Sequence, residues 1–196
     1  MTLEDLAAAL RARTPGIAPV DRIAPAHLPA GGFTPAAVLV PLLLRDGEVH
    51  VLLTRRRAEL RRHASQVAFP GGRIDPGEDS LAAALREAQE EVALDPARAE
   101  VMGRLSETLV LQSAFRLTPW VASVPYPYPY AAAPGEVAEI LLVPLAALAR
   151  PGAHRVEPRE AYGMRVDVHY YAVGPDVIWG ATGRVLAELL SLWRAS

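Results

Sequence analysis

The segment 80–92 constrains the fold more than any other part of the chain. It has the pattern of an amphipathic helix, which must lie with one face on a larger layer. Its apolar residues recur at helical spacing and form one stripe, made of Leu81, Ala84, Leu85, Ala88 and Val92. Either Asp79 or Ser80 can cap the first turn. The helix therefore needs a sheet or another helix to cover this stripe.

Three glutamates, Glu87, Glu90 and Glu91, are expected to lie off the apolar stripe. Residues three and four apart are neighbours on a helix, so Glu87 lies near both of the others, and each like-charge pair costs about 0.2–0.5 kcal/mol. A hard divalent cation removes this repulsion, and it prefers carboxylate oxygens as ligands. The cluster therefore predicts a metal site.

Composition limits what kind of protein can carry this site. The 196 residues are 51% apolar and 21% charged, with a net charge of −2, which suits one globular domain with a substantial core. There is no cysteine, which excludes disulfides and thiol nucleophiles and favours the cytoplasm without excluding other compartments. No apolar run approaches the roughly 18 residues of a membrane span, so we expect no membrane partner. The near-neutral charge argues against a nucleic-acid partner.

The chain divides into a short N-terminal part and a larger domain. Residues 3–13 have the pattern of an amphipathic helix, and residues 14–35 contain five prolines, as expected for an irregular arm. We therefore expect residues 1–35 to be a helix and a proline-rich arm, and residues 36–196 to form the domain.

Within the domain, strands and helices are mixed. Short apolar runs bounded by turn residues predict strands at 36–44, 49–54, 66–69, 100–105, 107–112, 117–124, 139–143 and 168–173. Further helices are expected at 144–149 and 181–194. The Pro70-Gly71-Gly72 step is expected to break the strand that precedes it. Because strands and helices do not alternate regularly, the fold class is predicted to be α+β.

A longer pattern surrounds the three glutamates. Its fixed positions are Gly72, Glu78, Arg86, Glu87, Glu90 and Glu91, followed by Val92 and Leu94. This spacing resembles the signature box of the Nudix hydrolases, matched at every fixed position except Ala93, where the family has glycine. The resemblance implies the Nudix fold, a mixed β-sheet sandwiched between helices.

A second motif narrows the resemblance. Residues 52–72 are similar to the upstream motif of the coenzyme A pyrophosphatase branch, which they match at Leu52-Leu53-Thr54, Arg56, Arg61 and Phe69-Pro70-Gly71-Gly72. Ser65 and Ala114 stand where the branch has glycine, as Ala93 does in the box. Where the family needs a left-handed backbone at such positions, a residue other than glycine costs about 1 kcal/mol.

The resemblance also implies roles for individual residues. Glu87 and Glu91 are expected to bind Mg²⁺ or Mn²⁺, with Glu90 as a further ligand, and Arg86 is expected to orient a glutamate. The substrate-binding candidates are Arg56, Arg61, Phe69, Gly71 and Gly72. The general base stays open between Glu90 in the box and two candidates outside it, Glu136 and Glu139.

The implied reaction is metal-dependent hydrolysis of the pyrophosphate bond of coenzyme A or acyl-CoA, giving 3′,5′-ADP and (acyl-)4′-phosphopantetheine. Two alternatives stay open: a pyrophosphatase for another nucleoside diphosphate derivative, such as ADP-ribose, NADH or capped RNA, and a catalytically silent Nudix domain that only binds. The oligomeric state is also open, with a homodimer among the options. We expect Tyr126, Tyr128 and Tyr130 to lie in a solvated loop rather than to stack on adenine.

Overall fold

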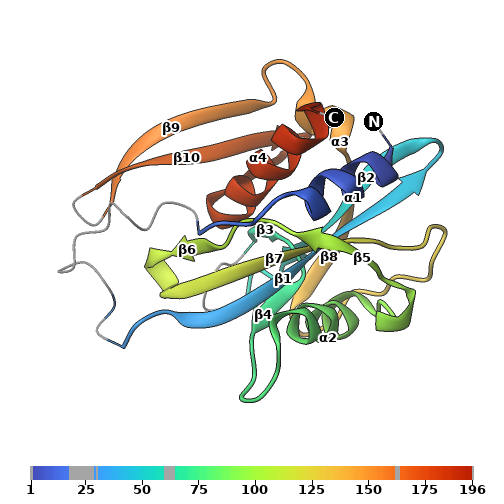
Figure 1. Cartoon of the computed structure of the whole chain (residues 1–196), viewed down its shortest axis with the longest axis horizontal. Coiled ribbons are helices and arrows are strands. Elements are labelled where there is room, and N and C mark those ends of the chain that lie inside the picture. Colours follow the sequence, from blue (N-terminus) through green and yellow to red (C-terminus); the bar gives the residue numbers. More distant parts are fainter. Residues whose placement is uncertain (1, 18–28, 30, 60–64, 162–163, 196) are drawn as a thin grey trace.

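The computed structural model describes residues 2–17, 29, 31–59, 65–161 and 164–195 (Figure 1). Its helices are α1 (Leu3–Ala12), α2 (Ser80–Val92), α3 (Leu145–Ala149) and α4 (Gly180–Ala195), with 3-10 turns η2 (Pro96–Arg98) and η3 (Leu111–Ser113). Its strands are β1 (Thr34–Arg45), β2 (Glu48–Arg56), β3 (Val67–Ala68), β4 (Gly71–Arg73), β5 (Glu100–Arg104), β6 (Thr108–Val110), β7 (Phe115–Ser123), β8 (Val137–Pro144), β9 (His154–Ala161), β10 (Met164–Val173) and β11 (Asp176–Trp179).

The central sheet is built around β1, in which every residue from Ala36 to Leu43 is buried. Such a continuous apolar run is typical of a strand that is covered on both faces. The order is β3-β2-β1-β7-β5, with β4 also paired to β1, β6 to β7 and β8 to β2. The β1–β7 pair is parallel and β1–β2 is antiparallel, so the sheet is mixed.

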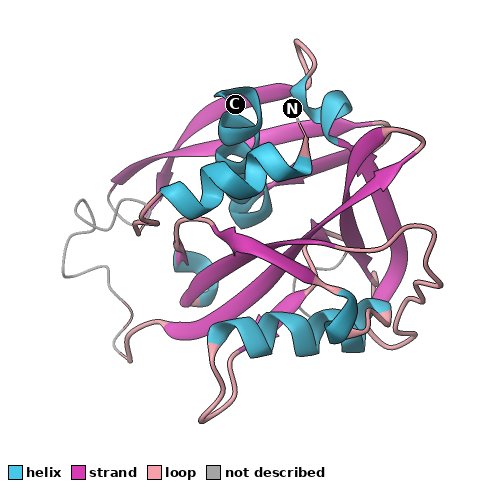
Figure 2. Ribbon diagram, turned by 45° about the vertical axis from the view of Figure 1, so that its right-hand side comes forward, coloured by secondary structure: helices cyan, strands magenta, loops and turns pink. Residues whose placement is uncertain are grey.

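Helices cover both faces of this sheet (Figure 2). On one face, Ala84 and Ala88 of α2 pack with Leu39 of β1. On the other face, Leu6 of α1 and Leu186 of α4 belong to a second core cluster. This arrangement confirms the predicted α+β class with a mixed sheet between helices.

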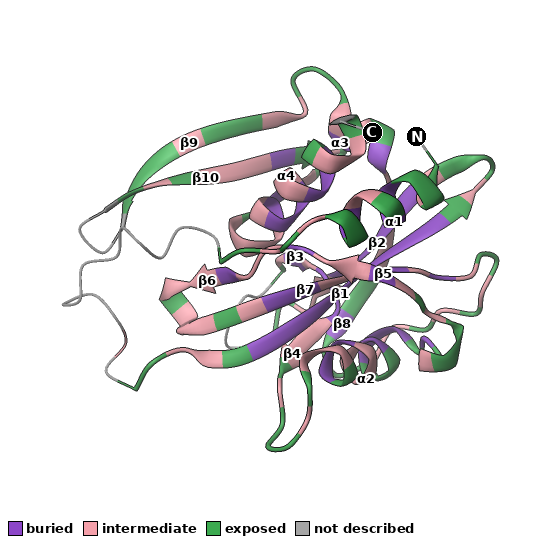
Figure 3. Cartoon of the chain, viewed as in Figure 1, coloured by how far each residue is buried: buried purple, intermediate pink, exposed green. Residues whose placement is uncertain are grey.

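A separate three-stranded antiparallel sheet, β9-β10-β11, lies on the side of α4 (Figure 1). The predicted strand 168–173 falls within β10, whereas β9 and β11 were not predicted. Exposed residues predominate along β9 (Figure 3), so it lacks the apolar alternation by which a strand is recognised. Tyr171 and Ile178 are the buried residues that attach this sheet to the core.

The structure also tests two further predictions. The Pro70-Gly71-Gly72 step ends β3 as expected, and Gly71 and Gly72 then form a short strand, β4, against β1, which was not predicted. The N-terminal helix is confirmed as α1, and its Leu6 and Leu10 are buried in the core that includes α4. Most of the expected arm, residues 18–28 and 30, lies outside the described residues.

Within the described residues, no helix is both long and apolar enough to cross a membrane.

Candidate active site

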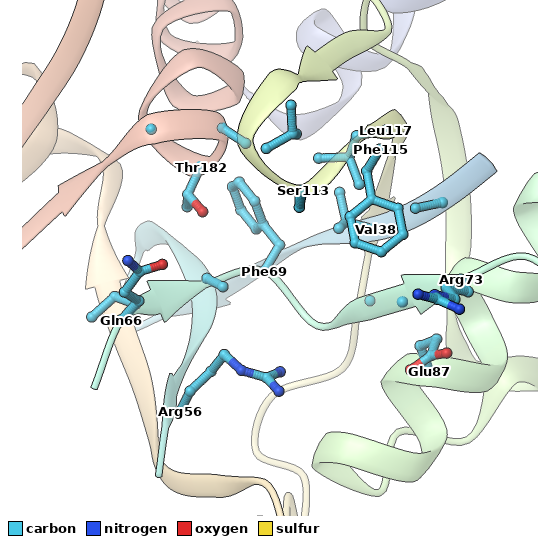
Figure 4. Close-up of a pocket in the computed structure, with 18 of the residues that line it drawn as sticks. Val38, Arg56, Gln66, Phe69, Arg73, Glu87, Ser113, Phe115, Leu117 and Thr182 are labelled. Atoms are coloured by element: carbon cyan, nitrogen blue, oxygen red, sulfur yellow. The ribbon is translucent and has the colours of Figure 1, made fainter. Parts of the chain in front are cut away.

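A pocket of about 630 Å³ opens where the central sheet, the side of α2 and the start of α4 meet. Figure 4 shows Arg56 and Glu87 in its lower half and Phe69, Phe115 and Leu117 in its upper half. Other lining residues that matter below are Gln66, Gly71, Gly72, Glu91, Glu136, Trp179 and Thr182. Charged groups and apolar walls therefore share one cavity.

Arg86 of α2 makes several hydrogen bonds, both to the segment before the helix and to glutamates on the helix. Its Nε and Nη2 donate to the two carboxylate oxygens of Glu78 at 3.0 and 3.1 Å, and Nη2 also donates to the carbonyl of Arg73 at 3.0 Å. Its Nη1 donates to Oε1 of Glu87 at 2.9 Å and to Oε2 of Glu90 at 3.4 Å. The guanidinium therefore joins the loop before α2 to the helix and fixes the carboxylate of Glu87.

Two glycines of β4 lie very close to neighbouring groups, Gly72 to this carboxylate and Gly71 to the backbone of β1. A Cβ on Gly72 would lie 2.5 Å from Cδ and 2.7 Å from Oε2 of Glu87. A Cβ on Gly71 would lie 2.7 Å from Cα of Val38 in β1. Gly71 therefore lets β4 approach β1, and Gly72 lets the backbone pass directly beside Glu87, where burial raises the pKa of the carboxyl.

Glu91 is the buried member of the glutamate cluster, with 4% of its surface exposed. Burial raises its pKa to about 8; Arg56 opposes this, and the charges of Glu87 and Glu136 add to it. The nearest nitrogen of Arg56, Nη1, is 3.9 Å from Oε1 of Glu91. Arg56 and a backbone hydrogen bond from Gly71 therefore offset only part of the desolvation cost of this carboxylate.

This burial corrects one prediction from the sequence. The glutamates were expected off the apolar stripe, but the buried face of α2 consists of Ala83, Ala84, Ala88, Glu91 and Val92. The small alanines let the helix approach the sheet closely, and the predicted stripe residues Leu81 and Leu85 are only half-buried. The helix is therefore rotated enough to carry Glu91 inward while Glu87 stays at the pocket wall.

Arg56 lies between two carboxylates. Its Nη2 is 3.9 Å from Oε2 of Glu136, opposite its contact with Glu91. The Nε of Arg56 is buried and has no hydrogen-bond partner among the described residues. Because Arg56 lines the cavity and its distances to both carboxylates are long, its guanidinium is suited to bind an anionic oxygen of a ligand.

The structure separates the two outside candidates for the general base. Glu136 lines the pocket, whereas Glu139 lies outside its lining and accepts hydrogen bonds from Nε and Nη2 of Arg55 at 3.1 and 3.0 Å. Arg55 also pairs with Asp176 of β11. Arg61, the second arginine of the upstream motif, lies outside the described residues.

The predicted cluster of three glutamates is only partly assembled. Glu87 and Glu91 line the pocket, but the side chain of Glu90 is 59% exposed and outside the lining. Nowhere in the described ranges do three or more His, Asp or Glu side chains come together as a complete metal site. The carboxylates of Glu87 and Glu91 do face the pocket. Carboxylate oxygens are the hard ligands that suit Mg²⁺ or Mn²⁺.

The loop that carries Tyr126, Tyr128 and Tyr130 has a different position from the one expected. The Tyr128 hydroxyl donates to the carbonyl of Ala93 at 3.2 Å and accepts from the Asp95 N–H at 2.9 Å. The Ala133 N–H donates to the carbonyl of Glu91 at 2.9 Å. This loop therefore caps the C-terminal end of α2 and is neither simply solvated nor a stacking platform in the pocket.

Several lining residues had no assigned role in the sequence analysis. The apolar wall includes Phe115 and Leu117 at the start of β7, and Trp179 and Thr182 lie where β11 runs into α4. Without the fold, nothing indicated that the two segments meet.

Comparison with known proteins agrees with this arrangement. The NUDIX domain family model matches residues 33–162. The chain is 42% identical over 161 residues to a protein of Cronobacter sakazakii described as an uncharacterized Nudix hydrolase NudL, covering 79% of this chain and 80% of that one. The corresponding protein of Citrobacter koseri is 42% identical over 159 residues, with the same coverage.

Solved structures support the fold. The chain resembles a MutT/nudix family protein from Enterococcus faecalis with a TM-score of 0.60 at 14% identity, covering all of this chain and 71% of that one. It also resembles RenU, a Nudix hydrolase from M. smegmatis, with a TM-score of 0.51 at 26% identity, covering 62% of this chain and 79% of that one. By its sequence match, its signature box and its fold, the chain belongs to the Nudix hydrolases.

Proposed function

We propose that this Nudix hydrolase cleaves the pyrophosphate bond of coenzyme A or its thioesters, giving 3′,5′-ADP and (acyl-)4′-phosphopantetheine. The observation that carries the proposal is the pocket itself, which combines the carboxylates of Glu87 and Glu91 with Arg56 and an apolar wall. A substrate with a pyrophosphate at its centre and long arms on both sides suits such a cavity. The branch-like motif in residues 52–72 favours coenzyme A among such substrates.

Glu87 and Glu91 would hold Mg²⁺ or Mn²⁺, with Glu90 as a further ligand. When bound, the ion neutralises phosphate oxygens and lowers the pKa of a coordinated water. Arg86 keeps Glu87 in place through its 2.9 Å hydrogen bond. Because Gly72 has no side chain, the backbone of β4 can lie directly against this carboxylate.

Arg56 would bind a non-bridging phosphate oxygen through its guanidinium, because it lines the pocket beside Glu91 and Glu136. Glu136 is our candidate for the general base, because it lines the pocket and its carboxylate is 3.9 Å from Arg56. A side chain that is 57% exposed can exchange protons with solvent after each turnover. Glu139 is disfavoured because Arg55 holds it outside the pocket.

The test is to incubate the purified protein with coenzyme A and acetyl-CoA, each with Mg²⁺ or Mn²⁺, and to separate the products by chromatography. We expect metal-dependent release of 3′,5′-ADP, and a Glu91→Gln variant that stays folded but loses most turnover. ADP-ribose, NADH, capped RNA and 3′-dephospho-coenzyme A complete the panel. Preference for one of these substrates would refute the coenzyme A assignment, and no turnover of any pyrophosphate would favour a silent binding domain.

A further inference from the structure

The outer face of the three-stranded sheet carries a stack of one cation and two aromatic rings. Tyr170 of β10 lies directly opposite Trp179 of β11 and directly opposite Arg155 of β9. The Tyr170 and Trp179 rings are nearly parallel, at 13°, with centroids 6.2 Å apart. The Cζ atom of Arg155 lies 4.5 Å from the centroid of the Tyr170 ring. The three side chains therefore form one row across the strands.

This row ends at the pocket. Trp179 is the last residue of β11, it is 42% exposed, and it is part of the pocket lining. Tyr170 stacks against it from the side of β10, and on the other side β11 lies beside β3, whose residues Val67 and Ala68 also line the pocket. A further ring stacked on the free side of Trp179 would therefore lie inside the cavity.

We infer that Trp179 forms a stacking site for a planar heteroaromatic base, so that a bound base extends the row Arg155–Tyr170–Trp179 by one layer. Every nucleobase has a π-face that stacks on an aromatic side chain. Because Tyr170 supports the indole from behind, Trp179 is held in place before the ligand arrives, which reduces the entropy lost on binding.

Polar groups near this site suit the edges of a nucleoside. Gln66, just before β3, and Thr182, in the first turn of α4, line the pocket on the side away from Glu87 (Figure 4). An amide both donates and accepts hydrogen bonds, as does a hydroxyl, so these side chains match a base edge or a ribose. Only the identity of the base rests on the proposed function: if the substrate is coenzyme A, the base is adenine. The apolar wall around Phe115 is then left for the pantetheine arm.

The experiment measures the two halves of the substrate separately, by calorimetry on the full-length protein. Replacing Trp179 by leucine should weaken binding of 3′,5′-ADP by about 10-fold or more, the effect of losing one base-stacking contact. Binding of 4′-phosphopantetheine should stay within twofold. Val177→Ala is the matched control, since Val177 is an exposed residue on the same strand and the same face but outside the pocket lining.

A second variant keeps the test valid if the leucine variant is unstable. Trp179→Phe keeps a stacking ring, so the affinity for 3′,5′-ADP should change by only a few fold. The quenching of tryptophan fluorescence by 3′,5′-ADP, however, should largely disappear. Quenching that persists in Trp179→Phe, or a loss of phosphopantetheine affinity in place of 3′,5′-ADP affinity, would overturn the inference.

The outcomes separate this inference from the proposed function. If coenzyme A is cleaved but both Trp179 variants bind 3′,5′-ADP as the wild type does, the stacking site is refuted and the proposed function stands. If coenzyme A is not cleaved but ADP-ribose binding depends on Trp179 in the same way, the stacking site stands and the substrate assignment fails.

Discussion

Replacing Ala93 by glycine removes a methyl group from a backbone that is already in the left-handed region. Ala93 follows the last turn of α2 with φ 58° and ψ 28°, and its N–H donates to the carbonyl of Gln89 at 3.0 Å. A left-handed residue at this position is a common way to end a helix, and glycine is the usual occupant. Since Ala93 is exposed, its methyl group contributes little packing. We therefore expect Ala93→Gly to stabilise the fold.

The magnitude follows from two opposing contributions. The left-handed conformation costs an L-residue roughly 1–2 kcal/mol. Glycine avoids this cost in the folded state. It also makes the unfolded chain more flexible than alanine does, which lowers the free energy of unfolding by about 0.4–1 kcal/mol. The net gain in the free energy of unfolding is therefore about 0.5–1 kcal/mol, which raises Tm by about 1–4 °C in a chain of this length.

Guanidinium unfolding of the wild type and Ala93→Gly measures this gain directly. Ala93→Val should move in the opposite direction, because a β-branched residue fits the left-handed region worse than alanine. Ala97→Gly is the matched control: Ala97 is exposed in η2 and is not among the residues with positive φ, so glycine should slightly destabilise the fold there. Equal effects at positions 93 and 97 would refute the argument from backbone strain.

Three further predictions concern the site and its surroundings. Gly72→Ala should abolish turnover without unfolding the protein, because its Cβ would lie 2.5 Å from Cδ of Glu87; activity and circular dichroism measure the two effects. Tyr128→Phe should lower kcat more than it raises KM, since the hydroxyl holds the end of α2 to the loop that leads to the candidate base. Burial lowers the pKa of His154 and of His169 in the fold, so these two groups should contribute a loss of stability as pH drops below about 6.5, because the unfolded chain binds more protons at them. The raised pKa of Glu91 acts in the opposite direction, so the test is the difference in pH slope between unfolding curves of the wild type and His169→Asn at pH 7.5 and 5.5, and the histidine contribution should be smaller in the variant.

Matched controls keep these three predictions specific. Gly135→Ala should leave activity intact, because no atom lies within 4 Å of the added Cβ. Tyr130→Phe should spare kcat, since its hydroxyl bonds to Pro125 within the loop and not to α2. Active Gly72→Ala enzyme, equal kcat for both tyrosine variants, or an unchanged pH slope in His169→Asn would each contradict the corresponding reasoning.

The predictions from the sequence were strongest where one local pattern determines one local structure. The buried run of β1 and the helix 80–92 both needed only a short window, and the structure confirms them. Ser65, Ala93 and Ala114 were compared with family glycines, and all three have positive φ, at 58°, 58° and 54°. At these three positions the backbone therefore adopts the left-handed conformation that glycine favours, although the residues are serine and alanine.

The sequence was least informative where the partner of a residue lies far along the chain. Whether Glu91 faces the core depends on which helix face the sheet covers, and alanines at 83, 84 and 88 made that face hard to identify. The strands β9 and β11 are held by pairing with β10; β9 carries few apolar residues, and β11 is only four residues long. Trp179 could not be placed in the pocket because its position depends on that pairing.

The arginine run at 55–57 shows how the fold divides one charge cluster among separate tasks. The register of β2 against β8 shifts between Arg55 and Arg56, a bulge that redirects side chains at a strand end. Arg55 consequently binds Glu139 and Asp176 and so joins β11 to the central sheet. Arg56 lines the pocket, and Nη1 of Arg57 donates to the carbonyl of Pro134 at 3.0 Å. A summed positive charge in the sequence therefore overstates the charge available to a substrate, because among these three arginines only Arg56 lines the pocket.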